Sequence, residues 1–140
     1  MKTIRQSSPF ARNALRRRGA ATVELAVVLP VMLTLVLGTI EVCHRIFLRQ
    51  SSVLVAYEGC RLAARSTSST EDVVSRCQQL LSQRRVVDGQ VTVTPANLLE
   101  QPPGTPIQVR ITIPWASNTP TRFVLQDQGT VFVDAFMLRE

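Results

Sequence analysis

The chain has 140 residues, a formal net charge of +6 and three cysteines. This length allows one small domain beside an apolar segment. Six of the 16 basic residues precede Gly19 with no acidic residue among them, and from Gly19 onward arginines and acidic residues are equal in number. The excess charge therefore belongs to the N-terminal leader, a pattern that favours a membrane-topology signal over nucleic-acid binding.

A transmembrane helix is predicted over residues 20–40. Glu24 is its only charged residue, and at about 1.5 Å per residue it crosses a hydrocarbon core of about 30 Å. Because Arg16, Arg17 and Arg18 directly precede the span, the N-terminus is expected in the cytoplasm and the remainder is expected to be exported. A cleavable secretory signal is less favoured because its apolar region is usually about 7–15 residues long.

Three residues in or near the predicted transmembrane helix bear on its interpretation. Pro30 removes a backbone donor inside the span and predicts a local kink, although an ordinary anchor also tolerates proline. Glu24 is costly in an apolar environment unless it lies near an interface or finds a partner. A lipoprotein signal ending at Cys43 is less favoured, because the charged Glu41 stands where small uncharged residues are expected.

The helix is predicted to continue outside the membrane over residues 41–65, because no breaker follows the span. Helical spacing predicts a buried stripe, and three polar residues lie on another face. The predicted stripe comprises Ile46, Val53, Tyr57, Cys60 and Ala64, and the polar face comprises Arg45, Arg49 and Ser52.

Residues 66–140 are predicted to form a small α+β domain. A polar loop at 66–70 precedes a second helix, with Thr70 expected as its N-terminal cap. Its apolar side carries Val73, Cys77, Leu80 and Leu81. Alternating apolar residues and turn signals then predict an antiparallel sheet of three or four strands, at 91–94, 107–113, 123–125 and 131–138.

The cysteines and isolated aromatic residues offer few chemical sites. Cys60 and Cys77 lie symmetrically about the polar loop, so an exported hairpin favours a disulfide between them over two buried thiols. Cys43 is left over, free or paired between molecules. His44, the only histidine, is expected in solvent or among headgroups, and Trp115 at the edge of the core rather than in a binding site. No metal ligand set, phosphate loop or catalytic constellation is recognised, so we expect no enzyme and no cofactor.

The junction of leader and span carries a family resemblance. Arg-Arg-Arg-Gly at 16–19, followed by Ala-Ala-Thr-Val-Glu at 20–24, resembles the processing site of type IV prepilins and pseudopilins. Residues 16–64 resemble the TadE-like family of the tight-adherence pilus apparatus more closely. That resemblance rests on Val23-Glu24, Leu29-Pro30 and the segment Glu58-Gly59-Cys60-Arg61.

The resemblance implies a minor pseudopilin of tight-adherence (Flp-type) pilus assembly in the bacterial inner membrane. Residues 1–19 would be a leader that a prepilin peptidase removes between Gly19 and Ala20, where glycine also lets the backbone leave the helix. The freed Ala20 amine would pair with Glu24 and set the register between helices, or Glu24 would simply lie at the interface and complement the helix dipole. Implied partners are the peptidase, pilin, other pseudopilins and the assembly platform. The alternative is a permanently anchored periplasmic binding module, without processing.

Overall fold

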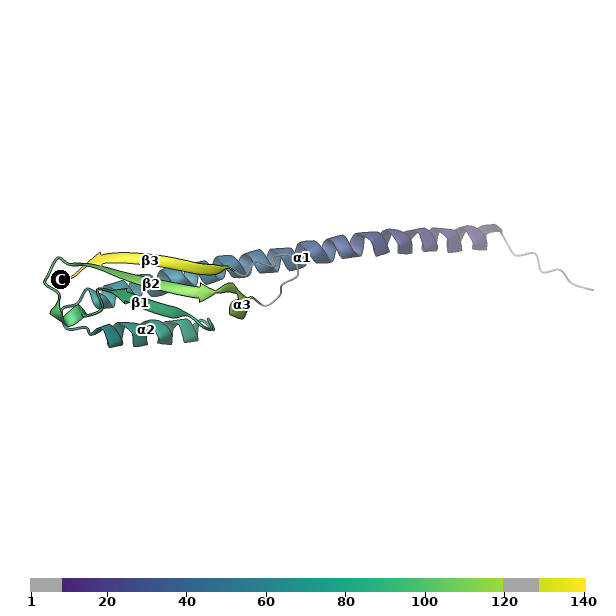
Figure 1. Cartoon of the computed structure of the whole chain (residues 1–140). Helices are drawn as coiled ribbons and strands as arrows, with labels where there is room; N and C mark the ends of the chain where they lie inside the picture. The colour runs from purple at the N-terminus through teal and green to yellow at the C-terminus, as the bar shows by residue number, and fades with distance from the viewer. Residues whose placement is uncertain (1–8, 120–128) are drawn as a thin grey trace, which may run out of the picture.

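The computed structural model describes residues 9–119 and 129–140, with side chains described from Gly19 onward. The described chain is α+β, as predicted: a long helix runs along and beyond a small domain made of a second helix and a three-stranded antiparallel sheet (Figure 1). The elements are α1 (Pro9–Ala63), α2 (Thr70–Gln83), β1 (Gln90–Thr94), η1 (Leu98–Glu100), β2 (Pro106–Pro114), α3 (Trp115–Asn118) and β3 (Thr130–Leu138). The strand predicted at 123–125 lies outside the described residues.

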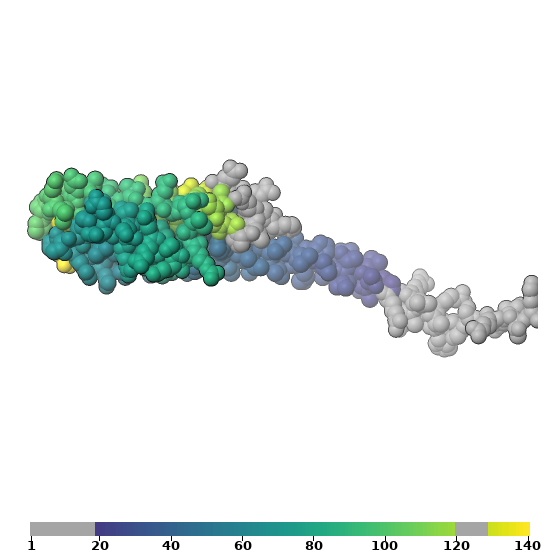
Figure 2. All heavy atoms as spheres, turned by 90° about the horizontal axis from the view of Figure 1, so that it is seen from below, coloured from purple at the N-terminus to yellow at the C-terminus, as the bar shows by residue number. Residues whose placement is uncertain are grey.

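The first half of α1 stands free of the domain. Its apolar part leaves the globular body as a bare rod (Figure 2), and the most apolar window has no residue buried inside the protein. The helix ends at Ala63, close to its predicted end, but it begins at Pro9 and passes through Gly19. A helix can pass through Gly19 because one glycine costs it only about 1 kcal/mol relative to alanine.

Only the last two residues of the predicted stripe of α1, Cys60 and Ala64, are buried. Ile46, Val53 and Tyr57 remain 52%, 47% and 54% exposed. The helix packs instead through a face rich in small side chains, because these let the sheet and α2 approach its backbone closely. Buried residues of this face include Glu41, Leu48, Ser51, Ser52, Val55, Ala56, Cys60 and Ala63. Ser52, predicted on a polar face, is accommodated because its hydroxyl donates to the Leu48 carbonyl at 2.8 Å.

Gly59 lies where α1 meets both α2 and β2. A Cβ atom at this position would be 2.6 Å from the Cys77 Sγ and 3.2 Å from the Val109 Cγ1, which is closer than packed carbon atoms approach. Its neighbours Glu58 and Arg61 form an ion pair of 3.4 Å on the surface of the helix. The Glu58–Arg61 segment therefore combines a close packing point with a solvent-facing pair.

The N-cap of the second helix lies one residue before the predicted cap. Ser69, rather than Thr70, is the N-cap: the Asp72 amide donates to the Ser69 hydroxyl at 3.2 Å, and the Ser69 amide donates back to the Asp72 carboxylate at 3.2 Å. The Ser69 hydroxyl also donates to the Asp72 carboxylate at 2.7 Å, and this hydrogen bond, with the one from the Ser69 amide, lowers the pKa of Asp72. The Thr70 hydroxyl instead donates to the Ala96 carbonyl, which ties α2 to the loop after β1.

The sheet has the order β1-β2-β3. Its inner face confirms the predicted alternation, because Ile107, Val109, Ile111 and Ile113 are all fully buried against the helices. On the outer face Arg110 donates to Asp134 on the adjacent strand, with N···O distances of 2.6 and 3.0 Å. These hydrogen bonds hold the pKa of Asp134 below its ordinary value.

The C-terminus closes the end of α1. The buried Arg139 guanidinium donates to the Ser66 carbonyl at 2.9 Å and to the Ala63 carbonyl at 3.4 Å. The Glu140 amide donates to the Ala64 carbonyl at 2.8 Å. A cation and an amide thus satisfy carbonyls that a helix end leaves unpaired, an arrangement that the sequence spacing did not reveal.

We predict that Gly59→Ala destabilises the domain by about 1 kcal/mol, because overpacking of about 1–3 kcal/mol exceeds the helix-propensity gain of up to about 1 kcal/mol. In a Cys77→Ala background the same change should cost less, since the closest opposing atom is gone. Gly19→Ala is the matched control, because no atom lies within 4 Å of its added Cβ. Thermal unfolding of the full chain in detergent measures all three, and an equal cost in both backgrounds would exclude the Cys77 contact as the cause.

Candidate functional site

The predicted processing and registry residues lie on the free part of α1. Gly19, Ala20 and Glu24 are all exposed. Because Ala20 and Glu24 are four residues apart, they share one helix face and are separated by about 6 Å along the axis. The Gly19–Ala20 bond is therefore clear of the folded domain, and the carboxylate lies one turn beyond it.

Pro30 lies within a helix that continues on both sides of it. Proline lacks the amide hydrogen that would bond the carbonyl of Ala26. The Thr34 hydroxyl donates to the Pro30 carbonyl at 2.8 Å, and the Thr39 hydroxyl donates to the Leu35 carbonyl at 2.8 Å. Polar side chains of the span thus bond their own backbone, which lowers their cost in an apolar environment.

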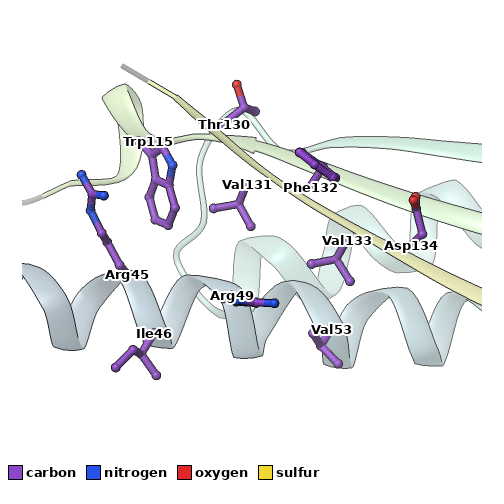
Figure 3. Close-up of a pocket in the computed structure, with 10 residues that line it drawn as sticks. All are labelled: Arg45, Ile46, Arg49, Val53, Trp115, Thr130, Val131, Phe132, Val133 and Asp134. Carbon is purple, nitrogen blue, oxygen red and sulfur yellow. The ribbon is translucent and has the colours of Figure 1, made fainter. Parts of the chain in front are cut away.

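A groove of about 650 Å³ opens beside the point where α1 enters the domain (Figure 3). It runs between α1 and the first half of β3. The Arg45 guanidinium lies 4.9 Å from the centroid of the Trp115 ring and forms one end. Trp115 packs against the core cluster, as predicted. The walls are Arg45, Ile46, Arg49 and Val53 of α1, Trp115, and residues 130–134 of β3. The groove combines apolar walls with guanidinium groups, and no pattern in the sequence indicated it.

His44 is not in the predicted solvent or headgroup position. It is half-buried, and its Nε2 forms a hydrogen bond with the Asn118 carbonyl. The Asn118 side chain in turn accepts from the Val87 amide at 2.8 Å and donates to the Val87 carbonyl at 2.8 Å. His44 therefore fastens α1 to α3 and to the segment before β1. This link joins positions too far apart in the chain for sequence spacing to predict it.

The predicted disulfide is absent from this structure, in which all three cysteines are free. The buried Cys60 Sγ donates to the Ala135 carbonyl at 3.1 Å, and the Cys77 Sγ donates to the Val55 carbonyl at 3.8 Å. Burial raises the pKa of the Cys77 thiol to about 11, and the nearby Cys60 adds to the shift. Both thiols thus lie in the core between α1 and its neighbours, and the bridge stays a prediction for the oxidised protein.

Within residues 9–119 and 129–140, no group of three or more His, Cys, Asp or Glu side chains is placed to hold a metal ion. The conspicuous features are instead an exposed apolar helix, long enough to cross a membrane, and a groove at its junction with the domain.

These features define a small α+β protein in which the described residues contain one apolar helix of membrane-spanning length. Residues 19–61 match the family model described as TadE-like protein. This segment is therefore similar to the TadE-like family, which confirms the resemblance found in the sequence. The match contains Glu24, Pro30 and the Glu58–Arg61 segment, and it begins at Gly19. Comparison with curated proteins and with solved structures found no match.

We predict that alkylation of the reduced protein distinguishes its thiols. Cys43 is exposed, whereas Cys77 is buried with a pKa of about 11, so Cys77 should react more than about a hundredfold more slowly at neutral pH. Mass spectrometry of the peptides after timed alkylation measures both rates. Comparable rates would contradict the buried placement.

Non-reducing peptide mapping of protein isolated from the membrane then tests the bridge. A linked Cys60–Cys77 peptide would establish it under export conditions. Alkylation of both thiols in freshly isolated protein would remove it.

Proposed function

We propose that the chain is a minor pseudopilin-like membrane protein that acts in assembly of a tight-adherence pilus. The observation that carries this proposal is the TadE-like match, which begins at Gly19. A basic leader precedes the matched segment, and the segment itself contains the free apolar helix. A prepilin peptidase cuts between Gly19 and Ala20, and the mature chain associates through its N-terminal helix. The proposal assigns no enzymatic activity to the chain itself.

The exposed segment of α1 supports the processing step. A protease needs its target bond accessible and extended or locally unfolded, and nothing in the domain covers Gly19 or Ala20 among the described residues. The helix through Gly19 must open for cleavage, which glycine makes easier than any residue with a side chain would. In this proposal the basic residues of the leader keep the N-terminus at the cytoplasmic face of the inner membrane. The domain at the other end of the span then lies on the opposite side.

Glu24 supports the association step. Its side chain is exposed on a helix that no other part of the described chain covers. In an apolar environment a lone carboxylate is unfavourable. Pairing with the Ala20 amine of a neighbouring helix compensates both charges only when the two helices meet in one register. The proposed partners are pilin, other pseudopilins and the inner-membrane assembly platform.

The groove beside Trp115 favours a second candidate function, a permanently anchored binding module that is never processed. Its volume of about 650 Å³ falls in the range of ligand pockets. This candidate predicts an intact leader, so the mass of the membrane-extracted chain separates the two. A chain beginning at Ala20 supports the pseudopilin, and an uncut chain supports the module.

We predict that Gly19→Leu reduces processing about a hundredfold, because a branched side chain displaces the scissile bond from its productive position. The variant should still insert and fold, since the substitution precedes the span. Gly19→Ala is the milder control and should retain more cleavage. Intact-mass spectrometry and membrane fractionation measure both outcomes, and normal cleavage of Gly19→Leu would refute this processing site.

We predict a different defect for Glu24→Ala. The leader should still be removed, and membrane insertion should be unchanged or improved because a costly carboxylate is lost. Crosslinking to pilus-assembly partners should fail, and Glu24→Gln should fail likewise if the charge sets the register. Normal cleavage with undiminished crosslinking would show that Glu24 is an interfacial residue only.

A further inference from the structure

β3 is an edge strand whose outer side has no strand partner in the described chain. Its ladder to β2 fixes which backbone groups point outward. The Trp115 amide donates to the Gly129 carbonyl at 3.1 Å, and at the other end the Arg139 amide donates to the Thr105 carbonyl at 2.9 Å. Hydrogen-bonded residues alternate with outward-facing ones in an antiparallel ladder. The odd-numbered residues 129–139 therefore bond β2, and the backbone groups of 130, 132, 134, 136 and 138 face the free edge.

This edge lacks the features that normally protect an edge strand. Nine residues long, β3 contains no proline and no lysine. Its one charged residue, Asp134, is already paired with Arg110 of β2. Phe132, Phe136 and Leu138 are 71%, 67% and 61% exposed on the outer face. The opposite edge is different, because β1 has only five residues and Pro95 follows it.

The groove lies along this same edge. Val131 and Val133 project toward α1, whereas Phe132 lies on the opposite side of the strand (Figure 3). A strand added beside β3 would place alternate side chains over the outer face and over the groove. On the groove side they would meet Ile46 and Val53, which are half-exposed, and the guanidinium of Arg49. Arg49 takes part in none of the ion pairs between described residues, so a carboxylate is the complementary group there.

A second copy of the chain does not fit the edge in the antiparallel sense. β3 runs in the same direction as α1, because its start adjoins Arg49 and its end adjoins Ala63 (Figures 1 and 3). Antiparallel pairing of two β3 edges would point the two apolar helices in opposite directions. Two chains anchored with one topology in one bilayer cannot adopt that arrangement.

We infer that β3 and the adjoining groove bind an extended segment of a different protein by strand addition. The segment carries apolar side chains toward Phe132 and Phe136 and at least one acidic side chain toward Arg49. Main-chain hydrogen bonds to β3 supply affinity, and the two side-chain faces supply selectivity. This interaction goes beyond the proposed function: it requires neither cleavage at Gly19 nor pairing of Glu24, so it holds equally for an unprocessed chain.

The test uses the full chain in lipid nanodiscs and a synthetic ten-residue peptide of alternating valine and glutamate. Amide hydrogen exchange should slow at Phe132, Asp134 and Phe136, while Val133 and Ala135, already bonded to β2, should not change. A valine–lysine peptide should bind about two- to fivefold more weakly, the range of an exposed ion pair. Arg49→Gln should remove much of that difference.

Backbone and side-chain contributions are separated by a matched pair. Phe136→Pro and Phe136→Ala both remove the ring, but only proline removes the outward amide, a substitution that edge strands tolerate. Proline should therefore weaken binding more than alanine does. A valine–glutamate peptide with methylated backbone nitrogens should not bind, which keeps the test decisive if the proline variant misfolds.

Three results would overturn the inference. In the first, the amides of Phe132, Asp134 and Phe136 already exchange slowly without peptide, because the chain itself or a second copy covers them. In the second, the valine–glutamate peptide at millimolar concentration leaves their exchange unchanged. In the third, the peptide slows consecutive β3 amides equally, so the alternation expected of strand addition is missing.

Discussion

The close approach of α1 to α2 and β2 at Gly59 is the contact on which the domain depends. Because a Cβ atom there would collide with Cys77, the two helices and the central strand meet around a single hydrogen atom in place of a side chain. Cys60 and Ala63 continue the same small-residue face. This packing sets the distance between α1 and the sheet, and thereby the position of β3 relative to the exposed side of the helix.

The surface pattern of α1 changes along its length, from an apolar segment outside the domain to a segment with one face packed in the domain. Over the span, apolar side chains are exposed all round, as expected of a segment whose surroundings are lipid. From Glu41 onward one face is buried in the domain, although Ile46, Val53 and Tyr57 keep the opposite face apolar and open. The groove and the free edge of β3 border that open face, so surfaces suited to partners run from the membrane segment into the domain.

The two proposals use different physics. Association through Glu24 relies on the high cost of an unpaired charge in lipid, which makes helix register energetically important. Strand addition at β3 relies on backbone groups that water would otherwise satisfy, and on apolar side chains that remain exposed. The two proposed interactions therefore use separate surfaces of the chain, one on the apolar part of α1 and one on the domain.

Local patterns were sufficient for α2 and the three described strands, but not for the short helices η1 and α3. The apolar run with one carboxylate defined the span, the apolar positions Val73, Cys77 and Leu81 defined the inner side of α2, and strict alternation from Ile107 to Ile113 defined the buried face of β2. These signals reside in a few neighbouring residues, where period and polarity determine which face is buried. The motif from Gly19 to Glu24 was equally local, and so was its resemblance to a known family.

Tertiary structure alone decided which face of α1 is inside. Size favoured Ile46, Val53 and Tyr57, but the helix packs through a face rich in small residues, which lets the sheet and α2 approach its backbone closely. The His44–Asn118 link and the Arg139 cap join positions more than 70 residues apart, and the open edge of β3 follows from strand order. Local periods indicated the apolar helix, α2 and the strands, whereas contacts between distant residues formed the groove and left the edge of β3 open, because no local period records which elements become neighbours.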